Sequence, residues 1–264
     1  MTIHYELKDN IAWIYLDDPT SLNAFDKESV GELKNALLQA KNDDPSVLVI
    51  TGKGKAFSAG GNVKLMKEAI DSENPAKYME SVVPPLGEIV QLIYDLPFIT
   101  VAAINGACAG AGLGLALHCD FRVAKESAVI TPGFIKLAGT PDTGTSYALP
   151  RIIGYSKAID FLLFSPAWKA NKALEEGLLH RVFPDEQFEE KLNEFLETLI
   201  KLPKYASRQT KLLLRKAFTN TLKEHMELEK NSMITAAKDP DHAEGVNAFV
   251  EKRHADFPST KQNN

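Results

Sequence analysis

The sequence predicts an α/β protein whose C-terminal part is helical, and two observations support this prediction. Through the first two-thirds of the chain, short apolar runs bounded by Asp, Pro and Gly alternate with segments of helical periodicity. From about Phe188 onward the segments are helical and contain few β-branched clusters. We therefore expect a core over residues 1–190 and a C-terminal helical region over residues 191–264.

Three apolar runs have the length and composition of buried strands. They are residues 11–16 (IAWIYL), 47–51 (VLVIT) and 98–104 (FITVAAI). Each run is short, and Asp, Pro or Gly lies at its ends. Because helical segments separate these runs, we expect an α/β architecture.

Helical periodicity marks the segments between and after these strands. Residues 28–41 place their apolar side chains on one face, and Asp26 is the expected N-cap. Residues 75–95 form a second helical pattern, which we expect to kink or start at Pro84 and Pro85. The C-terminal helices are expected at 192–202, 207–218 and 222–237, followed by a disordered tail at 259–264 (STKQNN).

Composition narrows the class of protein. A chain of 264 residues with 44% hydrophobic and 25% charged residues is long enough for one large domain, or for one domain with an appendage. The net charge of −5 argues against nucleic-acid and anionic-membrane partners, although a local basic patch for a small phosphorylated ligand stays open. The N-terminus lacks the pattern of a secretory signal, and no apolar run reaches membrane-spanning length. The two cysteines, Cys108 and Cys119, do not have the spacing of metal ligands. So few thiols in a chain of this size favour a reducing, cytoplasmic setting, and we expect both cysteines to be buried in the core.

Two expected strand-to-helix junctions contain almost no side chains. In the stretch FSAGGNVKLM, Gly60 and Gly61 follow a short apolar segment. In INGACAGAGLGLALHCD, Gly110 and Ala111 follow another, and a helical run begins at about Leu113. Glycine lets the backbone approach a ligand closely, and the first N–H groups of a helix point outward. Two such amides converging on one oxygen would form an oxyanion hole.

Simpler interpretations of these junctions remain open. Gly60 and Gly61 can form a plain turn, and the small residues after Gly110 can pack a helix tightly against a neighbour. Other sites are excluded, because the chain has neither the G-x-G-x-x-G pattern of a dinucleotide site nor a Walker loop. The chain also lacks a G-x-S-x-G elbow, an H-E-x-x-H motif and paired C-x-x-C motifs, so no metal site is visible.

Five blocks of sequence, taken together and in order, point to a known family. They are LNAFD (22–26), AFSAGGNVKLM (56–66), INGACAGAGLGLALHCDFRVA (104–124), TPDTGTSYALPRIIG (140–154) and EGVNAFVEKRHADF (244–257). This set resembles the crotonase superfamily, the enoyl-CoA hydratase/isomerase family, across nearly the whole chain. The resemblance implies a ClpP-like spiral of ββα repeats with a helical C-terminal trimerisation region. It also implies a homotrimer or a homohexamer built as a dimer of trimers.

The same resemblance implies an acyl-CoA thioester as substrate, with CoA as part of the substrate and no separate cofactor. Two backbone N–H groups would stabilise the thioester enolate, and they fall on Gly61 and Ala111. The residues implied to contact CoA are Ala24, Ala59, Asn62, Val63, Lys64, Phe249 and Lys252. Two of them have an alternative role: Phe249 can pack its helix, and Lys252 can be a solvated surface charge.

Two departures from the family pattern bear on the reaction. Hydratases of the family use two glutamates to activate water and to deliver a proton. At these two positions the present chain has Gly114 and Gly133. Because glycine cannot transfer a proton, the sequence argues against efficient addition of water.

Asp142 in the stretch TPDTG is the best candidate for the missing acid/base group. Isomerase-like members of the family carry an aspartate at this point, and one carboxylate suffices to move a proton between two carbons. The structural alternative is that Asp142 caps a turn or the helix that starts near Thr145. Residues 69–90 are expected to shape the acyl pocket.

Other polar residues are weaker candidates. We expect His118 to be packed core, and Asp120 to cap the end of its segment or to pair with Arg122. Glu68 and Asp71 are expected on a solvated helix face, and residues 175–176 on the surface.

The most direct hypothesis is an enoyl-CoA double-bond isomerase of fatty acid metabolism. The alternatives are a hydratase, another lyase or decarboxylase of the same fold, and a non-catalytic acyl-CoA-binding protein.

Overall fold

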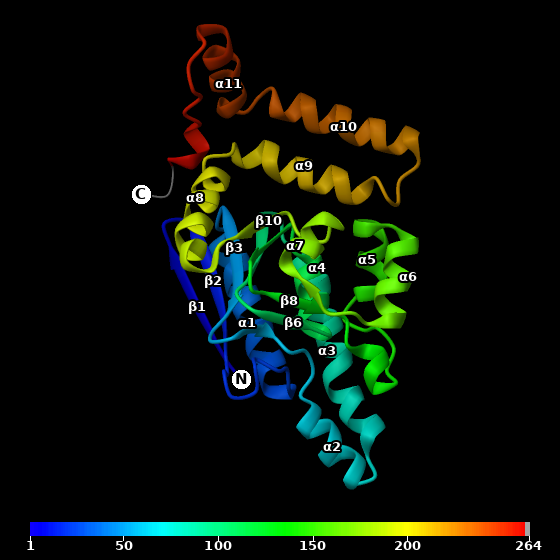
Figure 1. The fold of residues 1–264 in the computed structure, drawn as a ribbon. Coiled ribbons are helices and arrows are strands. Elements are labelled where there is room, and N and C mark those ends of the chain that lie inside the picture. The colour runs from blue at the N-terminus through cyan, green and yellow to red at the C-terminus, as the bar shows by residue number, and fades with distance from the viewer. Residues whose placement is uncertain (262–264) are drawn as a thin grey trace.

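The computed structural model describes residues 1–261 and contains two sheets surrounded by helices (Figure 1). Its strands are β1 (Thr2–Lys8), β2 (Ile11–Asp17), β3 (Val47–Gly52), β4 (Ala56–Ser58), β5 (Ile99–Ile104), β6 (Ala107–Ala109), β7 (Phe121–Lys125), β8 (Val129–Thr131), β9 (Trp168–Lys169) and β10 (Arg181–Phe183). Its helices are α1 (Lys27–Asp43), α2 (Val63–Asp71), α3 (Pro75–Asp95), α4 (Ala111–His118), α5 (Thr145–Ile153), α6 (Tyr155–Phe164), α7 (Ala170–Glu175), α8 (Phe188–Ile200), α9 (Lys204–Lys216), α10 (Leu222–Ala236) and α11 (Pro240–Glu251). Single 3₁₀ turns are η1 (Phe134–Leu137), η2 (Asp185–Gln187) and η3 (Pro258–Thr260).

The larger sheet has the strand order β1–β2–β3–β5–β7–β10 and is parallel except for the antiparallel β1–β2 pair. The three predicted strands are β2, β3 and β5, which are neighbours in this sheet. Parallel strands covered on both faces carry continuous apolar runs, and for this reason the sequence revealed them. The edge strand β1 (TIHYELK) was missed because its polar and apolar residues alternate over a largely exposed face.

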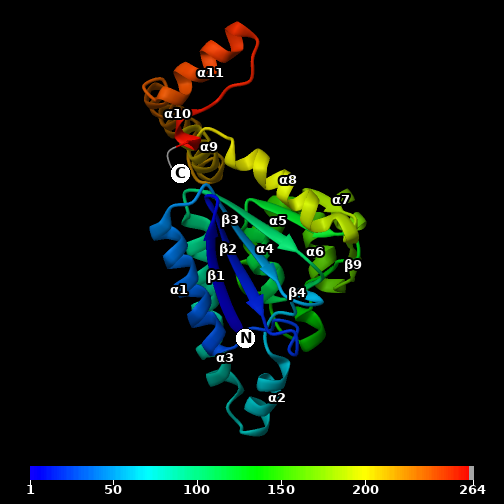
Figure 2. The same cartoon turned by 90° about the vertical axis from the view of Figure 1, so that its left-hand side faces the viewer.

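Helices cover both faces of this sheet, and the residues of β3 alternate between them. Leu48 and Ile50 belong to the cluster that also contains the buried faces of α1 and α3. Val47 and Val49 belong to a second cluster with the apolar face of α8. Figure 2 shows α1 and α3 on one side of the strands and α8 on the other. The α/β class predicted from the sequence is therefore confirmed.

The smaller sheet has the order β4–β6–β8–β9, with β4, β6 and β8 parallel and β9 antiparallel to β8. Parallel neighbours place their carboxyl ends at the same edge of a sheet. The turns that follow β4, β6 and β8 therefore meet at one edge, and both glycine-rich junctions belong to these turns.

The sequence predicted the N-cap of α1 and both ends of α3, whereas the alternative of a helix start at Pro84 and Pro85 is wrong. Asp26 caps α1 by accepting from Ser29 N, and Ser29 Oγ in turn accepts from Asp26 N. The helix predicted at 75–95 has these same bounds, but it continues through Pro84 and Pro85 without a break. Its buried face extends on both sides of the two prolines, and this packing holds the helix together where N–H donors are missing.

The C-terminal helices divide into a packed part and a projecting part. Helix α8 lies on the sheet, and α9 is fastened to it because Lys211 pairs with Asp120 (2.7 Å) and Arg215 pairs with the same carboxylate (2.8 Å). Helices α10 and α11 extend away from both sheets (Figures 1 and 2). The expectation that Asp120 pairs with Arg122 is wrong, because the Arg122 guanidinium donates to the carbonyl groups of Leu178 and Cys119 instead.

Parts of the tail predicted to be disordered are ordered. Pro258–Thr260 form a 3₁₀ turn, and Ser259 N donates to Asp241 Oδ1 at 2.9 Å. Residues 262–264 of that tail lie outside the described residues. Over residues 1–261, the structure contains no helix with the length and apolarity that crossing a membrane requires.

Candidate active site

Three turns at one edge of the smaller sheet form the centre of the candidate site. The turn after β4 contacts the turn after β6, since a β carbon on Gly60 would lie 2.9 Å from Ala109 O and 3.1 Å from Ala111 N. The turn after β6 is bonded to the turn after β8, because Gly110 N donates to Pro132 O at 3.1 Å. Gly60 has a φ of +90°, so both its backbone conformation and the close approach require glycine.

The N–H of Gly61 points away from the segment with which Gly61 pairs. Gly61 forms a parallel bridge with Phe25, in which Phe25 N donates to Gly60 O (2.7 Å) and Asn62 N donates to Phe25 O (3.0 Å). In an extended chain, adjacent N–H groups point in opposite directions. The N–H of Gly61 is therefore directed to the opposite side, where a ligand oxygen can accept from it.

The second amide belongs to Ala111, the first residue of α4. The first N–H groups of a helix have no intrahelical acceptor, and the helix dipole adds partial positive charge at this end. Gly110 has a φ of +51°, which turns the chain sharply from β6 into the helix. The predicted start at about Leu113 was two residues late, because the small residues there are themselves helical.

The structure brings Gly61 and Ala111 to one edge of the smaller sheet. A side chain at Gly61 would meet only the flexible end of Met66, whose Cε would lie 2.5 Å from the added β carbon. The role of these two amides as an oxyanion hole stays a prediction.

The two glycines at the glutamate positions lie in different surroundings. Gly133 follows β8 with a φ of +75°, and its N–H donates to Ser165 Oγ at 3.0 Å. Gly114 lies inside α4, where a β carbon would be 2.7 Å from both Cβ and O of Thr143 and 2.9 Å from Thr145 Oγ1. The space beside Gly114 is therefore filled by the segment that follows Asp142.

Asp142 is partly buried in this segment, next to α4. Burial raises the pKa of its carboxyl group, and hydrogen bonds from Thr143 and from its own N–H oppose this rise. Thr143 Oγ1 donates to Asp142 Oδ1 at 2.7 Å. The alternative role as a helix cap applies only to the backbone, because Thr145 N donates to Asp142 O (2.8 Å) and α5 has no side-chain cap.

His118 lies one helical turn beyond Gly114 on α4 and is buried, as expected. Its Nδ1 donates to Gly114 O at 2.8 Å, and burial lowers the pKa of its imidazole. A β carbon on Gly144 would lie 2.5 Å from His118 Cε1. The segment with Asp142 therefore rests on α4 at two successive turns of the helix.

Several of the residues expected to contact CoA lie together beside the first amide. Ala59 N donates to Leu22 O (2.9 Å), which holds the turn after β4 against the loop that contains Ala24. Asn62 is the N-cap of α2 and accepts from Lys64 N (3.1 Å) and Leu65 N. The Asn62 side chain is thus occupied by capping. Val63 and Lys64 follow it on the exposed first turn of α2.

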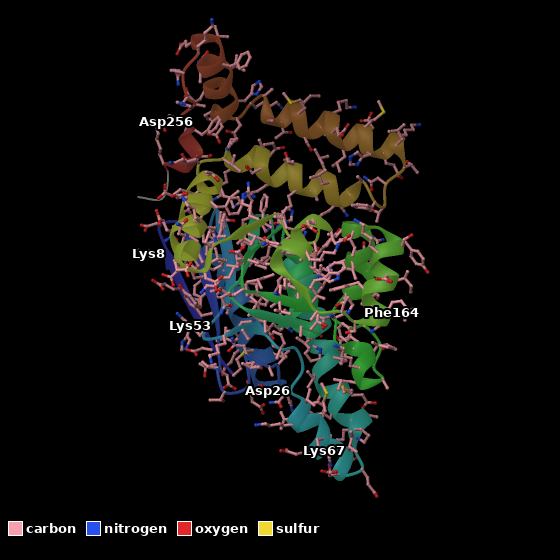
Figure 3. The ribbon with its side chains drawn as sticks, in the orientation of Figure 1. Lys8, Asp26, Lys53, Lys67, Phe164 and Asp256 are labelled. Carbon is pink, nitrogen blue, oxygen red and sulfur yellow. The ribbon has the colours of Figure 1, made fainter. Side chains whose placement is uncertain are left out.

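Phe249 and Lys252 are not close to that loop within the chain. Phe249 lies on α11 with 86% of its surface exposed, and Lys252 is the C-cap of the same helix. Helix α11 and helix α2 lie at opposite ends of the molecule, and Figure 3 shows Lys67 of α2 far from Asp256, which follows α11. A contribution of these two residues to a CoA site on a neighbouring subunit stays a prediction.

Three of the remaining weaker candidates, Glu68, Asp71 and Glu175, are exposed as expected, and Glu176 is partly buried. Glu68 is exposed, and Asp71 pairs with Lys67 on the outside of α2. Glu176 pairs with Lys157 (2.9 Å) beside α7.

The sequence did not identify Thr143 and Thr145, which fill the space beside Gly114. Thr143 is 4% exposed and adopts a φ of +49°, which is rare for a β-branched residue. Thr145 is fully buried, and its hydroxyl group has no hydrogen-bond partner among residues 1–261. The only signal in the sequence was their position directly after the candidate acid/base group.

Comparisons with known proteins show the family of the chain. A family model described as Enoyl-CoA hydratase/isomerase matches residues 6–261. The chain is 32% identical over 260 residues to the 1,2-epoxyphenylacetyl-CoA isomerase of Escherichia coli, covering 95% of this chain and 96% of that protein. It is 30% identical over 258 residues to the crotonyl-CoA hydratase of Syntrophomonas wolfei, covering 96% of each. The crystal structure of an enoyl-CoA hydratase from Bacillus anthracis superposes with a TM-score of 0.89 at 29% identity, covering 97% of this chain and 99% of that one. The chain therefore belongs to the enoyl-CoA hydratase/isomerase family, within the crotonase superfamily.

Proposed function

We propose that this protein is an enoyl-CoA isomerase that moves a carbon–carbon double bond along the acyl chain of a CoA thioester. The observation that carries the proposal is the packing of Thr143 against Gly114. One hydratase carboxylate is absent at that position, and its space is filled by the segment that supplies Asp142. A single carboxylate beside an oxyanion hole suits proton transfer between two carbons better than addition of water.

The proposed reaction conserves every atom. Asp142 removes a proton from the α-carbon of a 3-enoyl thioester, and the electron pair moves into a dienolate whose oxygen accepts from the N–H groups of Gly61 and Ala111. The same carboxyl group then returns the proton to the γ-carbon, which gives the 2-enoyl thioester. Each N–H donor is expected to stabilise the transition state by about 3 kcal/mol.

The surroundings of Asp142 support its proposed role. A general base works best when its pKa lies near the working pH, and burial raises the pKa of the Asp142 carboxyl group in that direction. The hydroxyl group of Thr143 donates to one carboxylate oxygen, Oδ1, at 2.7 Å. In the proposed reaction, the carboxyl group takes the proton of the substrate through its other oxygen.

Hydration of the double bond is the second candidate reaction. The similar proteins include both an isomerase and a hydratase by name. Hydration by this chain would require Asp142 or another group to activate water without either usual glutamate. The lack of carboxylates at Gly114 and Gly133 is the observation against it.

The test is incubation of the purified protein with 3-enoyl-CoA and, separately, 2-enoyl-CoA of several chain lengths. Chromatography separates positional isomers, and mass spectrometry measures their masses. We expect a product of unchanged mass and shifted retention, which Asp142→Asn should reduce by at least a hundredfold while CoA binding persists. A product heavier by one water, or full activity in Asp142→Asn, would contradict the proposal.

A further inference from the structure

Thr143 makes two contacts that together fix the position of Asp142. Its hydroxyl group donates to Asp142 Oδ1 at 2.7 Å. Its β carbon and carbonyl oxygen lie against the α carbon of Gly114, where an added β carbon would come within 2.7 Å of each. One residue therefore connects the carboxyl group to helix α4.

Helix α4 also carries the second proposed oxyanion amide. Ala111 begins the helix, and Gly114 follows it by three residues. Residues three apart lie on the same face of a helix, about 5–6 Å apart. A side chain wedged against Gly114 therefore holds the carboxyl group at a constant position relative to the N–H of Ala111.

We propose that Thr143 is a positioning residue, which orients the carboxylate of Asp142 and favours its ionised form by donating one hydrogen bond to Oδ1. The proposal rests on the proposed role of Asp142 as acid/base group. It adds that the hydroxyl group of Thr143, and not only the burial of Asp142, determines at which pH the carboxyl group ionises.

The backbone conformation of Thr143 supports its proposed role as a positioning residue. Its φ of +49° lies in the left-handed region, which β-branched residues rarely adopt. Such conformations persist where surrounding contacts hold them, and they concentrate at functional sites. Here the flanking bonds are Thr145 N to Asp142 O (2.8 Å) and Ala148 N to Gly144 O (3.0 Å).

The elements packed on this segment carry few charges near Asp142. Helix α4 has one titratable side chain on its buried face, His118, which contacts Gly144. Helix α3 contacts Gly144 through Val90. Tyr147 and Arg151 of α5 line a cavity of about 400 Å³, which His118 also lines and Asp142 does not. The hydrogen bond from Thr143 is therefore the main side-chain interaction that opposes the effect of burial on the pKa of Asp142.

Thr143→Val is the decisive variant, because valine keeps the shape and the β-branching of threonine. The left-handed backbone therefore costs the same in both proteins, and only the hydroxyl group is lost. Thr145→Val is the matched control, since it removes a buried hydroxyl group that has no partner, two residues from the same acid. Thr143→Ser restores the hydroxyl group without the methyl group.

Two measurements separate positioning from folding. The first is the pH profile of kcat/KM for the double-bond shift. Loss of a hydrogen bond to a charged group favours the protonated acid, so Thr143→Val should move the acidic limb to higher pH and lower kcat/KM below that limb by about tenfold. Thr145→Val should leave the profile unchanged, and Thr143→Ser should restore most of it.

The second measurement is the carboxyl ¹³C NMR titration of Asp142 in protein labelled at aspartate, with Asp142→Asn identifying the signal. It does not depend on activity. An upward shift of the Asp142 midpoint in Thr143→Val but not in Thr145→Val supports the inference. An unchanged midpoint in Thr143→Val, or an equal shift in Thr145→Val, overturns it. Absence of isomerase activity with a shifted midpoint would instead count against the proposed function alone.

Discussion

Gly114 and Thr143 occupy adjoining space so closely that no larger residue fits at position 114. A β carbon there would lie 2.7 Å from both Cβ and O of Thr143, well inside the distance that two such atoms tolerate. The glycine at this position is therefore part of the packing that seats the Asp142 segment on α4. It is not a vacant catalytic position that a carboxylate could simply reoccupy.

Replacing Gly114 should displace Asp142, because Thr143 fills the space beside Gly114. We expect Gly114→Ala to push the Asp142 segment away from α4, to destabilise the fold by about 2 kcal/mol and to lower kcat at least tenfold. Urea unfolding and steady-state kinetics measure the two effects. Gly31→Ala is the control, because Gly31 also lies in a helix but has open space around it. That change should stabilise α1 by about 0.5–1 kcal/mol and leave kcat unaltered.

The N–H of Ala111 can be removed with little damage to the helix. Ala111 is the first residue of α4, a position where proline is well tolerated. We expect Ala111→Pro to lower kcat by roughly a hundredfold or more, because one oxyanion donor is lost. Ala111→Gly keeps the donor and should stay within a fewfold of the original rate. Equal activity in both variants, with unchanged circular dichroism, would count against a role for this amide.

Asp142→Asn should lower activity and raise stability at neutral pH. Because burial raises the pKa of Asp142 in the folded protein, the folded state holds its proton more tightly than the unfolded chain does. This contribution to stability is fully present below the unfolded pKa of about 3.9 and is lost as pH rises through the folded pKa. At pH 7 the neutral amide should therefore be the more stable by no more than about 1 kcal/mol, because the carboxylate keeps part of its hydration.

Urea unfolding of both proteins at pH 7 and at pH 4 measures this difference, which should shrink at the lower pH. Asp71→Asn, on the exposed face of α2, serves as the control and should show no such trend. A difference that grows toward pH 4 would have the wrong sign for a buried acid whose pKa is raised.

Asp120 should be the residue that holds α9 to the sheet. Its carboxylate accepts from Thr100 N (2.8 Å) and pairs with Lys211 and Arg215, both of which are mostly buried. Removal of one partner from a buried ion pair leaves uncompensated charge, so Asp120→Ala should cost about 3 kcal/mol. Urea unfolding gives the cost, and limited proteolysis should then cut within or beside α9. Unchanged stability and an unchanged cleavage pattern would show that α9 is held by its apolar contacts instead.

The sequence determined the central strands of the larger sheet and the positions of the two glycine-rich turns. The strands β2, β3 and β5 are covered on both faces, so each carries an apolar run that stands out from its surroundings. Gly60 marks a close backbone approach that a side chain would block, and the positive φ angles of Gly60 and Gly110 favour glycine at both turns. Local signals of this kind are visible in a sequence because each depends on a few consecutive residues.

Only the tertiary structure decided which residues act on one another across the chain. Asp120 pairs with Lys211 and Arg215 because α9 packs on an element distant in sequence. Thr143 fills the space beside Gly114 because the Asp142 segment packs on α4. The continuation of α3 through Pro84 was likewise decided by packing, because its buried face contacts α1 and α4. Periodicity and turn residues report local conformation, whereas these contacts depend on where separate elements meet in space, which no local pattern encodes.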